Sequence, residues 1–252
     1  MRPMNPWRLE WLRLTRSARG ISLILVYVFF GLAGPLLAKY MQQVAKYASS
    51  DVTIIAPAPV PRHGIINFVS QGSQTGMIVL IVVAAGVLSF DARRGLATFY
   101  RTRVAGPFAL IWPRFVATTA LAIGAYTIGT AAAWFETTLV LGALPAHQIV
   151  PGVVLQAVFL LFAVAVVAAA STVGRSTLST AGISVVVLLV VLPVAGMVRS
   201  LAAWLPTRLL TAPAELVADA TVADYLKPVV VAVLATIMLL LFAVHRAGRR
   251  EL

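Results

Sequence analysis

Residues 149–173 read IVPGVVLQAVFLLFAVAVVAAASTV, a run without a single charged side chain. A transmembrane helix needs about 20 consecutive, mainly apolar residues to cross the hydrocarbon core of a bilayer. Within lipid the run must be helical, because each unpaired peptide group there would cost several kcal/mol. This stretch is therefore predicted to be a membrane-spanning helix.

Similar apolar runs lie on both sides of it, and together they predict six spans. The predicted spans are residues 21–38, 65–90, 115–140, 149–173, 178–198 and 228–244. No polar segment is long enough to form a core of its own, so residues 1–252 are predicted to form one domain. The expected fold class is an all-α polytopic membrane protein.

The composition supports this class and excludes others. Of the 252 residues 60% are hydrophobic and only 11% are charged, with a mean hydropathy of +0.94. Soluble domains carry about 25% charged residues. The net charge of +12 does not predict a nucleic-acid partner, because the basic residues separate apolar runs and do not gather on one polar face. The absence of cysteine excludes disulfides and cysteine metal sites.

The charges also predict an orientation. Six spans would place 14 of the 20 basic residues on the side of the two termini, and the other six on the opposite side with five of the eight acids. Basic residues accumulate in cytoplasmic segments of membrane proteins. We therefore expect both termini to be cytoplasmic, in a multi-pass protein of the cytoplasmic (inner) membrane.

Residues 1–20 are predicted to form an amphipathic helix at the membrane surface. Asn5 and Pro6 suit a helix start, and Trp7, Trp11, Leu14 and Ala18 form one stripe with most of the arginines on the remaining face. The alternative is that these arginines serve only as a topology signal.

The connection at residues 91–114 is the longest on the predicted cytoplasmic side. Residues 89–115 read SFDARRGLATFYRTRVAGPFALIWPRF, in which Leu96, Phe99, Tyr100 and Arg103 recur at helical spacing. A short helix here would expose an aromatic pair beside arginines, suited to a groove on a soluble partner. Equally, the arginines would serve only topology and contact with anionic lipid.

This connection resembles that of the permeases of type-2 ATP-binding-cassette exporters. Asp91, Arg94 and Gly95 match the opening of the family's motif and Arg114 matches its closing base, although Thr98 stands later than usual and residues 104–107 replace the usual turn. The six spans, the N-terminal helix and a loop at 199–227 that dips into the membrane before the last span also match the family's layout. The resemblance covers the whole chain.

The resemblance implies that residues 91–114 contact a nucleotide-binding ATPase subunit. The contact residues it implies are Asp91, Arg94, Gly95, Leu96, Phe99, Tyr100, Arg101 and Arg103. It further implies a second permease half, either an identical copy or a related chain. Mg-ATP would be bound by the partner subunit, and this chain would need no cofactor.

The second predicted span carries a polar face. Asn67, Ser70, Gln71, Gln74 and Thr75 share one side of a helix, and Asn67, Gln71 and Gln74 are candidates for lining a transport pathway. Alternatively, these side chains only hydrogen-bond neighbouring helices. An apolar, uncharged interior would suit a hydrophobic or amphipathic cargo such as a drug or a lipid.

Missing motifs help to distinguish the function classes. The sequence has no G-x-x-x-x-G-K-[ST], H-E-x-x-H or G-x-S-x-G pattern, so any ATPase is expected on another polypeptide and an enzyme is not expected. The middle of each predicted span lacks Asp, Glu, Lys and Arg, and Glu136 near the end of the third is the nearest candidate for a proton relay. A stand-alone secondary transporter and a structural or assembly protein remain the alternatives.

Overall fold

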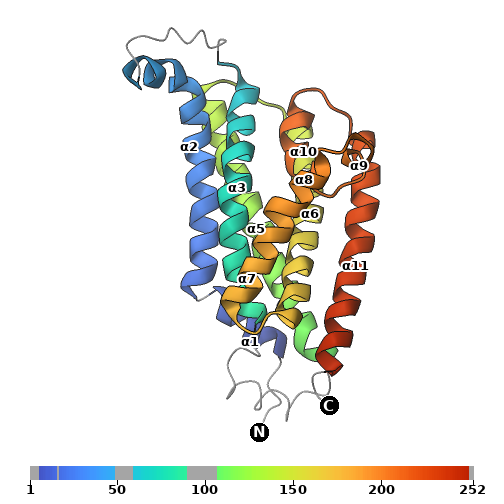
Figure 1. The fold of residues 1–252 in the computed structure, drawn as a ribbon. Helices are drawn as coiled ribbons and strands as arrows, with labels where there is room; N and C mark the ends of the chain where they lie inside the picture. The colour runs from blue at the N-terminus through green and yellow to red at the C-terminus, as the bar shows by residue number, and fades with distance from the viewer. Residues whose placement is uncertain (1–5, 16, 49–58, 90–106, 250–252) are drawn as a thin grey trace.

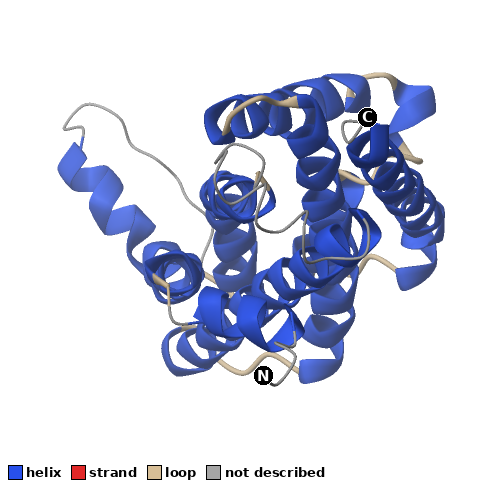
Figure 2. Ribbon diagram, turned by 90° about the horizontal axis from the view of Figure 1, so that it is seen from below, coloured by secondary structure: helices blue, strands red, loops and turns tan. Residues whose placement is uncertain are grey.

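The structure, a computed structural model, describes residues 6–15, 17–48, 59–89 and 107–249, and every regular element in these ranges is helical (Figures 1 and 2). The predicted all-α class is confirmed. The elements are α1 (Pro6–Thr15), α2 (Ala18–Ala48), α3 (Pro61–Leu88), α5 (Pro107–Val140), α6 (Ala146–Val173), α7 (Thr177–Val185), the π-helix η2 (Val186–Val191), α8 (Leu192–Gly196), α9 (Arg199–Ala202), α10 (Arg208–Val217), the 3₁₀-helix η3 (Val222–Tyr225) and α11 (Leu226–Arg249).

Five helical segments of the described ranges are long and apolar enough to cross a membrane. A sixth is α3, if its two halves, which meet at 40° between Gly72 and Gln74, count as one span. Each of the six predicted spans coincides with one of these segments. The set is compatible with a multi-pass membrane protein.

The two ends of the bundle differ in charge. We call the end where α1 and the last turns of α11 lie the basal end, and the opposite end, towards which α9 and α10 lie, the distal end (Figure 1). Described basic residues of the basal end include Arg13, Arg19, Arg114, Arg175, Arg246 and Arg249. The distal end holds Lys39, Arg62, Arg199, Arg208 and Lys227 together with Glu136, Glu215, Asp219 and Asp224. Within the described ranges most acids therefore lie at the distal end, whereas the predicted excess of basic residues at the basal end depends largely on arginines outside those ranges.

Tryptophan marks both ends as well. All five tryptophans are exposed, Trp7, Trp11 and Trp112 towards the basal end and Trp134 and Trp204 towards the distal end. Tryptophan side chains gather at the two membrane–water boundaries, where an apolar ring with one polar N–H is favoured. Their placement supports a bilayer lying between the two charged ends.

Two predicted connections are shorter than expected, because helices continue into them. Residues 39–48, predicted to begin a loop, belong to α2, and residues 107–114, assigned to the connection before the third span, form the start of α5. The segment 39–48 contains no proline or glycine, so nothing in it ends the helix. Pro107 and Pro61 each occupy the first helical position, where a missing N–H costs nothing.

The fifth candidate span contains an irregularity just before Pro193. The helix widens into the π-helix η2, and the N–H of Leu192 bonds to the carbonyl of Val187, five residues earlier. Proline lacks an N–H and its ring crowds the carbonyl one turn before it. A π segment immediately before the proline relieves this conflict without ending the span.

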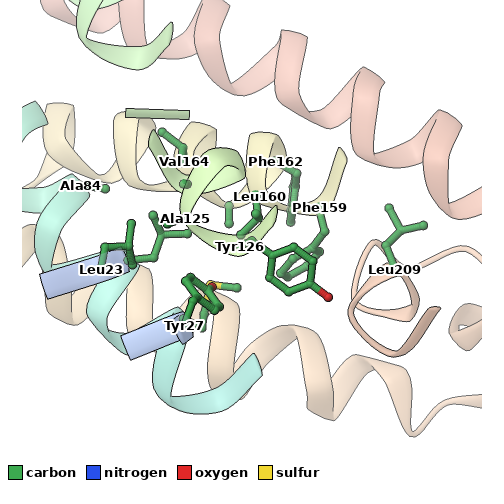
Figure 3. Close-up of a cluster of buried hydrophobic side chains, with 14 of the residues drawn as sticks. Leu23, Tyr27, Ala84, Ala125, Tyr126, Phe159, Leu160, Phe162, Val164 and Leu209 are labelled. Carbon is green, nitrogen blue, oxygen red and sulfur yellow. The ribbon is translucent and has the colours of Figure 1, made fainter. Parts of the chain in front are cut away.

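Helix α6 is the centre of the bundle and contacts α3, α5, α7, α10 and α11. It is apolar on all sides, and the alanines of its second half let neighbouring helices approach closely. Phe159, Leu160, Phe162 and Val164 of α6 belong to one buried cluster with side chains of α2, α3, α5 and α10, part of which Figure 3 shows.

Helices α2, α3 and α5 meet around the buried side chain of Tyr27. A Cβ atom at Gly129 of α5 would lie 2.7 Å from the Cβ of Tyr27, and one at Gly76 of α3 would lie 2.6 Å from its ring. The edge of Tyr27 packs against Tyr126, with ring centroids 5.5 Å apart (Figure 3). The absence of side chains at both glycines therefore sets the spacing of three helices.

The segment at 199–227, predicted to be a membrane-dipping loop, contains α9, α10 and η3. α10 buries Leu209, Ala212, Pro213, Leu216 and Val217 and packs against α6 and α3. Gly152 of α6 permits this contact, because a Cβ there would lie 2.7 Å from the Cα of Pro213. Whether the segment enters a membrane stays a prediction.

We predict that Gly129→Ala destabilises the bundle by about 1–3 kcal/mol, because the added methyl group must push α2 away from α5. Thermal unfolding of the purified chain in detergent would measure this loss. Gly124→Ala is the matched control, because a Cβ at Gly124 of the same helix meets nothing within 4 Å. Equal unfolding temperatures for the two variants would contradict the proposed helix spacing.

Candidate functional site

The predicted contact residues Asp91, Arg94, Gly95, Leu96, Phe99, Tyr100, Arg101 and Arg103 lie outside the described residues. The structure does describe both elements that this connection joins, α3 up to Ser89 and α5 from Pro107. Both meet the connection at the basal end, where α1 also lies (Figure 1). The candidate site is therefore built from the helix ends that surround the connection.

An ion pair joins α1 to α5. The Nε of Arg114 donates to Oε1 of Glu10 at 3.0 Å, and both side chains are buried, with 2% and 5% of their surface exposed. Arg13 also approaches Glu10, at 3.9 Å, but its side chain is 40% exposed. Removing two charges from water is costly, and only close, well-oriented pairing offsets it. The position of α1 against α5 is thus tightly specified.

Two further hydrogen bonds join helices at the same end. Nη1 of Arg19, at the start of α2, donates to the carbonyl of Gly86 in the last turn of α3 at 3.0 Å. The hydroxyl of Ser89, just after α3, donates to the hydroxyl of Thr180 in α7 at 2.9 Å. Both bonds lie within about one turn of the C-terminal end of α3, and each joins α3 to a neighbouring helix.

We call these three interactions, Glu10–Arg114, Arg19–Gly86 and Ser89–Thr180, the basal clamp. The clamp holds both helices that the connection joins: α3 is tied to α2 and α7, and α5 is tied to α1. A displacement of the connection would therefore move α3 and α5 together with the helices bound to them. This arrangement can transmit force from a partner at the basal end into the bundle.

The structure shows which residues of the N-terminal helix face the bundle, and its membrane-facing side stays a prediction. α1 begins at Pro6 as expected, but it turns Glu10 and Leu14 inwards and leaves Trp7 and Trp11 exposed. The predicted stripe of Trp7, Trp11, Leu14 and Ala18 is therefore divided between the two sides. The cause is Arg114, whose buried charge requires the carboxylate of Glu10 to face it.

The polar side chains of α3 lie in the middle of that helix and partly outside the bundle. Ser70, Gln74 and Thr75 are exposed, and Asn67 and Gln71 are half-buried beside them. Ser70 donates to the carbonyl of Asn67 within the same helix. The exposed members are not covered by the rest of the described chain, so in a bilayer they would face lipid unless water or another polypeptide covers them.

Other candidate chemistry is sparse in the described ranges. No group of three or more His, Asp or Glu residues there could hold a metal ion. Glu136 is half-buried about one turn before the end of α5, as the sequence placed it, and no charged residue lies in the middle of a span.

Sequence reasoning missed the Glu10–Arg114 pair. Glu10 is the only acidic residue before Asp51, and Arg114 stands alone between Pro113 and Phe115 in an apolar stretch. These two isolated charges have opposite signs and both lie on the predicted cytoplasmic side, which was the signal in the sequence that they could pair. Their partnership depends on how α1 lies against α5, which a single sequence does not specify.

No protein-family model, curated protein or solved structure matches this chain.

We predict that Glu10→Ala destabilises the protein by about 3–5 kcal/mol, because it leaves the buried guanidinium of Arg114 without its carboxylate. The charge-reversed pair Glu10→Arg with Arg114→Glu should regain part of that loss. Thermal unfolding in detergent would measure both, with Arg13→Ala as the control at an exposed position of the same helix. An effect of Glu10→Ala no larger than that of Arg13→Ala would show that the pair does not fix α1.

Proposed function

We propose that this chain is the membrane-spanning subunit of a type-2 ATP-binding-cassette exporter. A separate nucleotide-binding subunit would hydrolyse Mg-ATP and hold the connection at 91–114. The cargo would be a hydrophobic or amphipathic molecule, of drug or lipid type, moved out across the cytoplasmic membrane. The observation that carries this proposal is the basal clamp around that connection.

The clamp supports coupling to a motor because it makes the basal ends of several helices move as one body. A partner that pushed on the connection would act directly on α3 and α5. The Ser89–Thr180 bond would pass the movement on to α7, and the Glu10–Arg114 pair would pass it on to α1. Transport cycles of this kind use rigid-body or hinge movements of packed helices. The bend of α3 between Gly72 and Gln74 gives that helix two segments that such a movement could realign.

The exposed polar face of α3 supports a second permease half. Ser70, Gln74 and Thr75 lie at mid-helix, where contact with lipid is unfavourable. A second copy or a related chain facing α3 would cover them and enclose a route with polar walls. Asn67, Gln71 and Gln74 would then line the route for the cargo, as the sequence predicted.

The requirement for a separate ATPase rests on the sequence. The chain lacks the P-loop pattern whose backbone and lysine hold nucleotide phosphates. The pocket at the basal end, of about 190 Å³, does not supply a phosphate-binding lysine either. It is lined by Arg13, Leu14, Ser17, Arg19 and Val87.

A stand-alone secondary transporter is the main alternative, with Glu136 as its proton-binding group. The position of Glu136 near the distal end of α5 argues against this role, because a relay would be expected at mid-membrane. Loss of a proton-driven flux in Glu136→Gln would establish the alternative.

We expect the tagged chain, extracted from its native membrane in mild detergent, to co-purify with a soluble P-loop ATPase. Phe99→Ala should abolish ATP-dependent transport in reconstituted vesicles while leaving membrane insertion unchanged, since it removes an aromatic contact proposed to seat in the ATPase. Phe135→Ala is the control, because that phenylalanine is 61% exposed at the distal end of α5.

Transport at the normal rate by the purified chain without ATP would contradict the proposed function. Unchanged coupling in Phe99→Ala would contradict the proposed contact and leave the ATPase to be located elsewhere on the chain.

A further inference from the structure

An open depression of about 440 Å³ lies between α8, α9 and the first turn of α10, at the distal end. Arg199, Thr207, Arg208 and Thr211 supply its polar side chains. Its other lining residues are one glycine and two alanines, which leave space between the two arginines. The depression is far from the basal clamp and plays no part in the function proposed above.

Within the described residues neither Arg199 nor Arg208 forms an ion pair with a carboxylate. Glu215 instead accepts hydrogen bonds from the hydroxyls of Thr211, at 2.7 Å, and Tyr225. The depression therefore presents two guanidinium groups whose N–H donors are not taken up by a described carboxylate.

Asp224, the acid that interacts with Arg208 through space, is itself bound by Thr221 at 2.8 Å. The guanidinium of Arg208 lies over the ring of Tyr225, 5.4 Å from its centroid, which fixes its position and leaves its N–H groups available as donors. The N-terminus of α10 adds a partial positive charge beside the same arginine.

Exposed apolar side chains stand next to the lining residues in the sequence, and we call them the apolar rim. Met197 and Val198, between α8 and α9, and Leu201 of α9 are exposed to 82%, 50% and 48%. Trp204 follows at 50% exposure, and the ammonium of Lys227 lies 5.2 Å from the centroid of its ring. A tryptophan capped by a lysine is typical of the level of lipid headgroups. An inorganic anion would use the arginines and leave this apolar rim uncovered.

We propose that this depression binds the headgroup of an anionic phospholipid in the leaflet at the distal end. The phosphate would lie between Arg199 and Arg208, because a guanidinium donates paired hydrogen bonds to phosphate oxygens. The hydroxyl of Thr207 would bond to the same phosphate or to the glycerol, and the acyl chains would cover Met197, Val198 and Leu201. Basic pockets between membrane helices bind anionic headgroups by this chemistry.

Native mass spectrometry of the purified full-length chain, titrated with phosphatidylglycerol and with phosphatidylcholine, tests the proposal. We expect the wild-type chain to prefer phosphatidylglycerol. Each arginine removed should weaken phosphatidylglycerol binding about fivefold, first in Arg199→Gln and then again in the double variant Arg199→Gln/Arg208→Gln. Arg62→Gln is the matched control, because Arg62 is exposed at the same end outside the depression.

Arg199→Gln is the more direct variant, since Arg199 lacks the stacking contact that Arg208 makes with Tyr225; an unchanged unfolding temperature would show that it folds. Equal binding of the two lipids, or an unchanged preference in Arg199→Gln, would overturn the proposal. Displacement of phosphatidylglycerol by an equal concentration of glycerol phosphate would show that the depression recognises a free phosphate, and would overturn the assignment to lipid.

Discussion

The buried pair of Glu10 and Arg114 is the interaction on which the basal end depends. Each of these charges would be strongly unfavourable alone, so the two must stay within hydrogen-bonding distance. Meeting that requirement places α1 across the start of α5 and turns its tryptophans outwards. The bonds of α3 to α2 and α7 then complete a connected end. A partner bound at the basal end would therefore act on helices that are hydrogen-bonded to one another.

The rest of the bundle relies on close contact more than on polar bonds. Lipid is as apolar as a leucine side chain, so helices in a bilayer associate through tight packing and hydrogen bonds. The glycines facing Tyr27 and the alanines of α6 allow that packing. The outer faces of α2 and α11 stay apolar and exposed, with Leu25, Phe29 and Met238 as examples. The described fold is therefore closely packed at its centre, hydrogen-bonded between helices at its basal end, and apolar over much of its outer surface.

The sequence predicted the helical class and the position of each candidate span, because apolar length is a local feature. Element boundaries were less accurate: nothing in residues 39–48 ends a helix, and Pro107 starts one earlier than the apolar pattern does. The orientation of α1 and the Glu10–Arg114 pair were missed, since both arise from packing between segments about 100 residues apart. The sequence placed five polar residues of α3 on one helical face, and only the structure shows that part of that face is left uncovered by the described bundle.

The proposed function requires the clamped basal end to face the cytoplasm, where a soluble ATPase could reach it. The chain has no cysteine, so single cysteines can report each end without background. We would place them at Thr102 in the connection and at Ala143, exposed at the distal end, and treat intact spheroplasts with a membrane-impermeant maleimide. If the basal end faces the cytoplasm, Ala143→Cys is labelled in intact cells and Thr102→Cys is labelled only after permeabilisation. Labelling of Thr102→Cys from outside would contradict it.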